Sequence, residues 1–242
     1  MNSLKNKVAV ITGGNSGIGY ATAKALSKKG AKVIITGRRK EAIETAAAAL
    51  QVNGLLADQS NLSDIEKLAD QVRTQFGKVD ILLINAGITK FAPIELMTED
   101  VFDEIMNVNF KGAYFTLSKF IPILNDNASV VFLSSTSATI SPQSASVYAA
   151  SKSAINAVMK IAALELASRN IRVNAVSPGP VATEIMNKIG LDSNLEKQLI
   201  SSIPLLRMGK ANEVADMITY LSGYSAAFIT GSNFLLDGGQ SI

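Results

Sequence analysis

The sequence predicts an α/β fold in which helices cover both faces of a doubly wound, seven-stranded parallel sheet. Short apolar runs recur along the 242 residues, and most are continuously apolar rather than alternating, as expected for strands buried on both faces. Segments with helical spacing separate these runs, and this alternation favours right-handed parallel crossovers. Because ligands of such sheets bind at the carboxyl ends of the strands, we expect the functional site there.

The expected strands are the apolar runs at residues 8–11, 33–36, 54–57, 81–84, 130–133, 173–176 and 234–236. The expected helices are residues 17–29, 40–50, 63–76, a stretch near 100–124, and residues 146–168 and 212–223. Alanines at the end of the second helix indicate close packing on the sheet. No internal repeat or Pro/Gly-rich linker divides the chain, so residues 1–242 are expected to form a single domain.

One segment, residues 183–206, breaks the alternation. It carries many apolar side chains: Ile185, Met186, Ile189, Leu191, Leu195, Leu199, Ile200 and Ile203. An apolar insertion at the carboxyl edge of the sheet predicts a substrate lid. A helix pair that packs on the body or on a neighbouring subunit is an equal alternative, and the two interpretations are compatible.

The composition restricts the chemistry and the partners. The chain has no Cys, His or Trp, which excludes disulfides, thiol nucleophiles, imidazole bases and the usual zinc sites, so no metal is expected. The net charge of +3 comes without a long run of like charge, so no nucleic-acid partner is expected. The apolar run before Thr12 comprises only residues 8–11, too few for a signal peptide or a membrane span. We therefore expect a cytoplasmic protein with no membrane partner.

A glycine-rich turn follows the first expected strand and precedes a helix. Its candidate binding residues are Gly13, Asn15, Ser16, Gly17, Ile18 and Gly19. Glycines permit positive φ angles and close approach of the backbone, and a helix N-terminus presents free N–H groups to a diphosphate. This turn therefore predicts a Rossmann-type dinucleotide site, although its spacing differs from the general G-x-G-x-x-G pattern.

Further motifs appear in a fixed order: Asn85-Ala86-Gly87, Asn109, Ser135, Tyr148-x-x-x-Lys152 and Pro178-Gly179. Together with the glycine turn, their order and intervals resemble those of the short-chain dehydrogenase/reductase family. The resemblance runs from Lys7 to the closing Leu236-Asp237-Gly238-Gly239. It implies an NAD(P)-dependent oxidoreductase that transfers a hydride between nicotinamide and a carbonyl or alcohol substrate.

The resemblance also implies roles for the catalytic residues. Tyr148 would pass a proton to or from the substrate oxygen, and Ser135 would polarise that oxygen. Lys152 lies one helical turn from Tyr148, so its ammonium is expected to lower the phenol pKa, and it would also bind the nicotinamide ribose. Asn109 would hold a water on the path from the lysine to solvent.

The other matching positions would hold the coenzyme. Asp58 would bind the adenine. Asn85 would steady the central strands beside the coenzyme, and its neighbours Ala86 and Gly87 would also contact the coenzyme. Pro178, Gly179 and Thr183 would lie beside the nicotinamide. Most of the family is tetrameric, which predicts a homotetramer.

The end of the second strand favours NADP over NAD. Dinucleotide folds that prefer NAD place an acid there for the ribose 2′-hydroxyl, whereas those that prefer NADP use a nearby Arg for the 2′-phosphate. Here Gly37 takes the place of the acid, and Arg38 follows it. NAD stays open because Ser16 is not the basic residue that many NADP-preferring relatives carry.

Two alternative functions stay open. The first is a 3-oxoacyl-[acyl-carrier-protein] reductase, whose relatives carry basic residues at the entrance of the site. Arg169 fits one such position, but Asn125-Asp126-Asn127 stands where another is expected. The second is a non-catalytic nucleotide-binding redox sensor or scaffold, which would commonly lack the tyrosine or the lysine. The expected substrate is a small, partly apolar carbonyl or alcohol.

Overall fold

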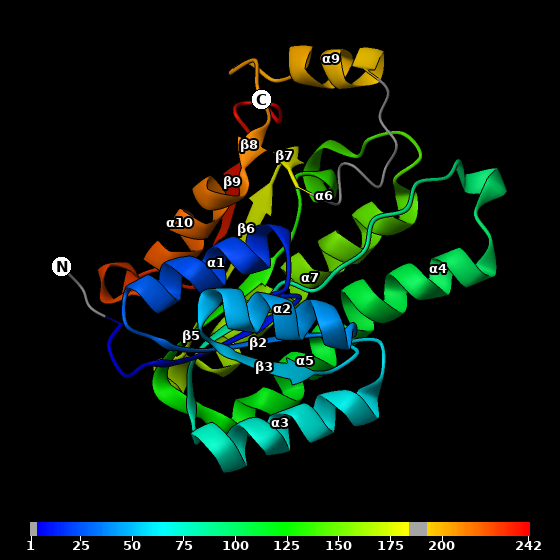
Figure 1. The fold of residues 1–242 in the computed structure, drawn as a ribbon. Coiled ribbons are helices and arrows are strands. Elements are labelled where there is room, and N and C mark those ends of the chain that lie inside the picture. Colours follow the sequence, from blue (N-terminus) through cyan, green and yellow to red (C-terminus); the bar gives the residue numbers. More distant parts are fainter. Residues whose placement is uncertain (1–3, 184–192) are drawn as a thin grey trace.

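The computed structural model describes residues 4–183 and 193–242. Its seven-stranded parallel sheet has the strand order β3-β2-β1-β4-β5-β6-β9, which confirms the predicted fold class. Figure 1 shows this sheet at the centre of the molecule, with helices packed around it. The strands are β1 Val8–Thr12, β2 Lys32–Gly37, β3 Asn53–Leu56, β4 Val79–Ile84, β5 Leu124–Leu133, β6 Arg172–Pro178 and β9 Asn233–Leu236.

Most helices follow the predicted segments, but the short helix at residues 137–140 was not predicted. The helices are α1 Gly17–Lys28, α2 Lys40–Leu50, α3 Leu62–Phe76, α4 Glu99–Met106, α5 Ala113–Phe120, α6 Ser137–Ile140, α7 Ser146–Glu165, α9 Ser193–Ser201 and α10 Ala211–Ser222. The predicted stretch near residues 100–124 is not one regular helix, because a π-helical turn at Asn107–Gly112 separates α4 from α5. A short parallel pair, β7 Val181–Ala182 and β8 Gly209–Lys210, was not predicted.

The core consists of two apolar layers, one on each face of the sheet. Alternate residues of each strand point to opposite faces, so Val10 packs with α3, α5 and α7, whereas Ile11 packs with α1, α2 and α10. Both side chains are fully buried. Burial on both faces explains why the strands read as continuous apolar runs.

The chain reverses its winding direction between β1 and β4, which are neighbours in the sheet although two strands separate them in sequence. A doubly wound sheet opens a crevice at such a point, at the carboxyl ends of its strands. The glycine turn follows β1 and the Asn-Ala-Gly motif follows β4, so the fold brings both to this crevice. In the part of the chain that the structure describes, no helix is long and apolar enough to cross a membrane.

Candidate active site

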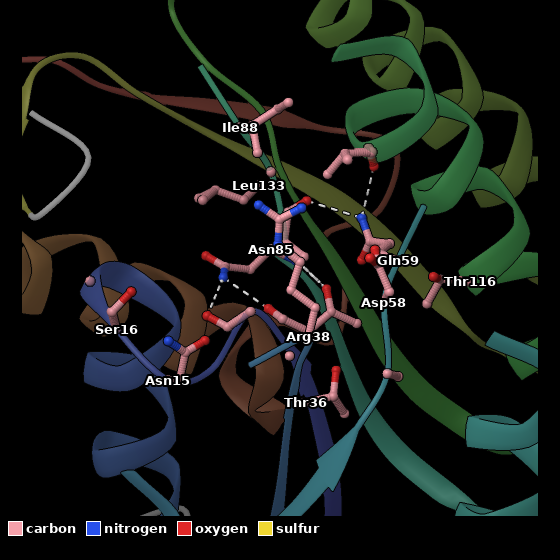
Figure 2. A pocket seen from close by; sticks show the side chains of 18 of the residues that line it. Asn15, Ser16, Thr36, Arg38, Asp58, Gln59, Asn85, Ile88, Thr116 and Leu133 are labelled. Carbon is pink, nitrogen blue, oxygen red and sulfur yellow. Dashed lines mark hydrogen bonds between the residues drawn. The ribbon is translucent and has the colours of Figure 1, made fainter. Parts of the chain in front are cut away.

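A cavity of about 240 Å³ lies at the carboxyl ends of β1, β2, β3 and β4 (Figure 2). Eleven of the predicted binding residues line it: Gly13, Asn15, Ser16, Gly17, Ile18, Arg38, Asp58, Asn85, Ala86, Gly87 and Thr183. Prediction from the sequence missed further lining residues, which are Thr12, Thr36, Gly37, Arg39, Ala57, Gln59, Ile65, Leu68, Ile88, Val108, Thr116 and Leu133. Most of these lie one or two residues from a predicted site residue. The ends of the predicted strands could therefore have identified them as cavity-lining residues.

The glycine turn has the geometry that a dinucleotide site requires. Gly13 and Gly17 have φ angles of +64° and +54°, which favour glycine. A Cβ on Gly19 would lie 2.3 Å from the Gly13 carbonyl oxygen, so the first turn of α1 packs directly on the loop. Gly17 and Ile18 of the first turn of α1 line the cavity, and no acidic residue of this turn competes for its free N–H groups.

Asn85 and Thr12 tie this loop to the end of β4. The Asn85 amide donates to the Thr12 and Gly13 carbonyl oxygens, at 2.8 and 3.0 Å. The Thr12 hydroxyl accepts from the backbone N–H groups of Asn85 and Ala86, both at 3.0 Å. These four bonds hold the two edges of the crevice at a fixed separation.

Arg38, Asp58 and Gln59 stand around the β2 and β3 side of the same cavity (Figure 2). The Asp58 carboxylate accepts from the Ser60 N–H and hydroxyl groups, at 2.9 and 2.8 Å, which fixes its orientation. A Cβ on Gly37 would lie 3.0 Å from Asn15 Oδ1, so an acid at this position would crowd the glycine turn. The 2′ end of a dinucleotide would therefore meet Arg38 and no acid at position 37.

The predicted catalytic residues come together beside this cavity. Tyr148 and Lys152 lie on one face of α7, and the Lys152 ammonium is 5.8 Å from the centre of the Tyr148 ring. Ser135 lies two residues after the end of β5, and its side chain forms a hydrogen bond with Tyr148, as does that of Thr89. The Phe91 ring packs edge-to-face on Tyr148, with the ring centres 6.1 Å apart.

Lys152 and Asn109 are buried and meet at Gly87. Lys152 Nζ donates to the Leu133 carbonyl oxygen at 2.8 Å. Asn109 Oδ1 accepts from the Ile88 N–H at 2.8 Å, and its Nδ2 donates to the Ile88 carbonyl oxygen at 2.9 Å. A Cβ on Gly87 would lie 3.2 Å from Asn109 Oδ1 and 3.5 Å from Lys152 Nζ, so both polar groups lie against this glycine.

Burial sets the direction of the pKa shift of both residues. Burial raises the pKa of the Tyr148 phenol above its usual value and outweighs the hydrogen bonds from Ser135 and Thr89, which lower it. The expected lowering by Lys152 is therefore not the net result in this structure. Burial also lowers the pKa of Lys152, to about 8, so the ammonium still carries most of its charge at neutral pH.

Four of the predicted coenzyme-binding residues lie outside the cavity lining. Gly19 and Lys152 stand behind it, as described above. Pro178 and Gly179 continue β6 toward Asp237; the Pro178 carbonyl accepts from the Thr136 N–H at 3.0 Å, and Gly179 N–H donates to the Leu236 carbonyl at 3.0 Å. This places them on the Ser135 side of the site rather than against the glycine turn.

Arg169 does not lie at the entrance of the site. Its guanidinium donates to Asp126 at 2.9 Å and to the carbonyl oxygens of Ile121 and Leu124. Leu124 begins β5, so Arg169 lies at the amino-terminal end of this strand, whereas the cavity lies at the carboxyl ends of the strands. Its guanidinium forms an ion pair with Asp126. Asp126 belongs to the segment where a second basic residue was expected.

The described residues fit a nicotinamide dinucleotide. The cavity has a helix N-terminus and a glycine turn for a diphosphate, and Asp58 just after the end of β3. Thr89, which bonds Tyr148, directly follows the lining residue Ile88. When bound, the coenzyme would be held by these lining residues and by Lys152.

Comparison with known proteins identifies the family. Residues 13–241 match a family model described as enoyl-(acyl carrier protein) reductase. The chain is 36% identical over 240 residues to an oxidoreductase of the fungus Sarocladium schorii, covering 98% of this chain and 96% of that one.

Solved structures of high similarity carry the same fold. A short-chain dehydrogenase/reductase variant of Serratia marcescens is 33% identical, with a TM-score of 0.93 and 99% of both chains covered. A 3-ketoacyl-(acyl-carrier-protein) reductase of Brucella melitensis, complexed with NADH, is 35% identical with a TM-score of 0.93, covering 99% of this chain and 100% of that one. A metagenomic blue fluorescent protein in complex with NADPH is 27% identical, with a TM-score of 0.94 and the same coverage. With a matching family model over almost its whole length, this chain belongs to the short-chain dehydrogenase/reductase family and is an NAD(P)-dependent oxidoreductase.

Proposed function

We propose that this oxidoreductase transfers a hydride between nicotinamide and a carbonyl or alcohol carbon, with Tyr148 as the acid or base. The observation that carries the proposal is that Ser135, Tyr148 and Lys152 come together beside a cavity lined by the glycine turn. The coenzyme supplies or accepts the hydride when bound. The protein positions the reactants and moves the proton.

Each residue has a distinct task in this proposal. In the reducing direction, Ser135 donates a hydrogen bond to the carbonyl oxygen and polarises it. Tyr148, kept protonated by its raised pKa, gives its proton to the same oxygen. The phenolate that results is stabilised by the Lys152 ammonium. Asn109 borders this ammonium across Gly87 and leads the proton path toward solvent.

NADP is the proposed coenzyme, on the arrangement at the end of β2. Arg38 lines the cavity and can pair with a 2′-phosphate, and Gly37 leaves no negative charge to repel it. NAD is the alternative, because Ser16 contributes no positive charge to the glycine turn.

A partly apolar substrate fits the surroundings of Tyr148. A hollow of about 390 Å³ lies next to it, lined by Thr89, Lys90, Phe91, Ala92, Leu96, Met97, Thr98 and Val101. Residues 183–206 are proposed as the lid of the site. Thr183 lies beside Gly17, and the β7–β8 pair brings the two ends of the lid together. Of the apolar lid residues expected from the sequence, Ile185, Met186, Ile189 and Leu191 lie outside the described residues.

A 3-oxoacyl-[acyl-carrier-protein] reductase is the narrower alternative. The Arg169–Asp126 ion pair leaves no free basic group at that position for an acidic carrier. A panel assayed with NADPH and NADH would compare ethyl acetoacetate, cyclohexanone, a hexulose and an acetoacetyl thioester of the carrier protein. Faster reduction of a free ketone than of the thioester supports the broader proposal. We also propose a homotetramer and a cytoplasmic location.

The decisive experiment is Tyr148→Phe. The ring keeps its packing against Phe91, but the transferable proton is lost, so turnover should fall by roughly 100- to 10,000-fold. NADPH binding, followed by its fluorescence, should change little. Tyr220→Phe is the matched control, because it removes a hydroxyl bonded to the Ser225 carbonyl far from the site. Undiminished turnover in Tyr148→Phe would refute the proposed role.

A further inference from the structure

Gln59 makes an unusual pair of bonds at the edge of the cavity. It directly follows Asp58 and is 8% exposed. Its amide nitrogen donates to the carbonyl oxygens of Ala86 and Val108, each at 3.0 Å (Figure 2). Its Oε1 is buried without a partner among the described residues. Burying an unpaired amide oxygen is unfavourable. The side chain is held in this position by the two hydrogen bonds of its nitrogen, and these two bonds indicate a role for it.

One of these bonds holds the π-helical turn at Asn107–Gly112. A π-turn interrupts the regular i to i−4 hydrogen bonding of a helix and is frequent at functional sites. Gln59 supplies a donor to Val108 inside this turn. The turn also packs on the Gln59 backbone, because a Cβ on Gly112 would lie 2.0 Å from the Gln59 carbonyl oxygen. Side chain and main chain of Gln59 therefore both fix the turn.

Each bonded carbonyl stands next to a residue of the proton path. Val108 directly precedes Asn109. Ala86 directly precedes Gly87, which is followed by Ile88. Asn109 in turn bonds both the N–H and the carbonyl of Ile88. The single amide of Gln59 thus spans the two segments that the Asn109–Ile88 pair joins, on the side of the cavity that faces Asp58.

We propose that Gln59 is a positioning residue, whose amide sets the spacing between Ala86 and Val108 and so holds Asn109 beside Lys152. It would link the adenine side of the coenzyme cavity to the proton path. This inference rests on the proposed function, because that function gives Asn109 and Lys152 their tasks.

The test is Gln59→Met, which keeps the length of the side chain and removes both donors. Hydrogen exchange of residues 107–112 in the coenzyme-free protein should become about tenfold faster. With NADPH and the best ketone of the panel, kcat should fall by about tenfold to a hundredfold, while the KM for NADPH stays within about threefold. Gln59→Asn, which keeps the amide but is too short to bond both carbonyls, should show the same pattern more weakly and serves if the first variant does not fold.

Asn174→Leu is the matched control. Asn174 is also a buried amide that joins two segments, donating to the Ile229 carbonyl at 2.9 Å and accepting from the Ser232 N–H at 3.1 Å, but it lies on β6 away from the proton path. It should lower Tm without changing the exchange of residues 107–112 or the kcat.

Two outcomes would overturn the inference. Unchanged exchange at residues 107–112 in Gln59→Met would show that the amide does not hold the turn. Faster exchange with unchanged kcat would show that the turn does not position the proton path. Neither outcome touches the proposed function, whose failure would appear separately as retained turnover in Tyr148→Phe.

Discussion

Lys152 is a buried cation whose pKa is lowered to about 8 by burial. Between pH 8 and its ordinary pKa near 10.5, the unfolded chain binds this proton and the folded chain does not, so stability rises with pH there. The Tyr148 phenol acts in the opposite direction only above its own ordinary pKa of 10.0, where the unfolded chain loses the proton that the folded chain keeps.

We therefore expect the free energy of unfolding of the coenzyme-free protein to rise by on the order of 1 kcal/mol from pH 7.5 to 9.5, relative to Lys152→Met. Urea unfolding of both proteins across this range measures the difference. Parallel pH profiles would show that Lys152 keeps an ordinary pKa in the folded protein.

Arg38 is the second residue that carries a prediction. Removing it in Arg38→Ala should lower kcat/KM with NADPH by about tenfold or more, because a charge-assisted contact to the 2′-phosphate is lost, and should leave the value with NADH almost unchanged. Lys40→Ala is the control for general loss of positive charge, since Lys40 is exposed and lies near Glu44 at the start of α2. A wild-type protein that prefers NADH would contradict the assignment.

At the residue scale, a sequence predicts best those groups whose type and spacing determine their chemistry. Tyr148 and Lys152 are four residues apart on a helix, and that spacing alone places them on one face. Their pKa directions were not predictable, because the burial that sets them depends on packing from other elements. Gln59 was missed for the same reason, since its partners lie 27 and 49 residues away.

At the scale of elements, the start of α1 decides how tightly the coenzyme is held. Gly19→Ala would put a methyl group 2.3 Å from the Gly13 carbonyl oxygen and force the helix away from the glycine turn. The affinity for NADPH should fall by about tenfold or more. Gly209→Ala is the control, because its Cβ would meet nothing closer than 3.5 Å. Equal affinities of the two variants for NADPH, measured by calorimetry, would contradict this account.

The same scale shows which elements a sequence can specify. Every strand of the large sheet lies within two residues of a predicted run except β5, whose amino-terminal half is more polar and begins at Leu124. The π-turn and the β7–β8 pair were not predicted. Each is stabilised by partners distant in sequence, such as Gln59 for the turn, and neither leaves a periodic pattern.

At the scale of the whole molecule, many large apolar side chains of the described residues are exposed, and two groups of them suit contacts between subunits. Ile161 and Leu164 of α7, with Tyr114 of the neighbouring α5, form one face, and they are 54%, 79% and 46% exposed. Tyr224 and Phe228 lie after α10, near the edge strand β9, and are 83% and 104% exposed. Exposed apolar groups gathered in this way mark interaction surfaces.

Two separate self-complementary faces are what a tetramer with two kinds of two-fold interface requires. We expect light scattering at micromolar concentration to give four times the chain mass of 25.5 kDa. Leu164→Glu places a charge at the centre of the α5–α7 face, where burial without a partner is costly, so it should reduce the particle to a dimer held by the other face. Lys28→Glu, a charge change at the end of α1, should leave the mass unchanged. A wild-type mass of one chain would refute the tetramer, and an unchanged mass in Leu164→Glu would show that the α5–α7 face is not the interface.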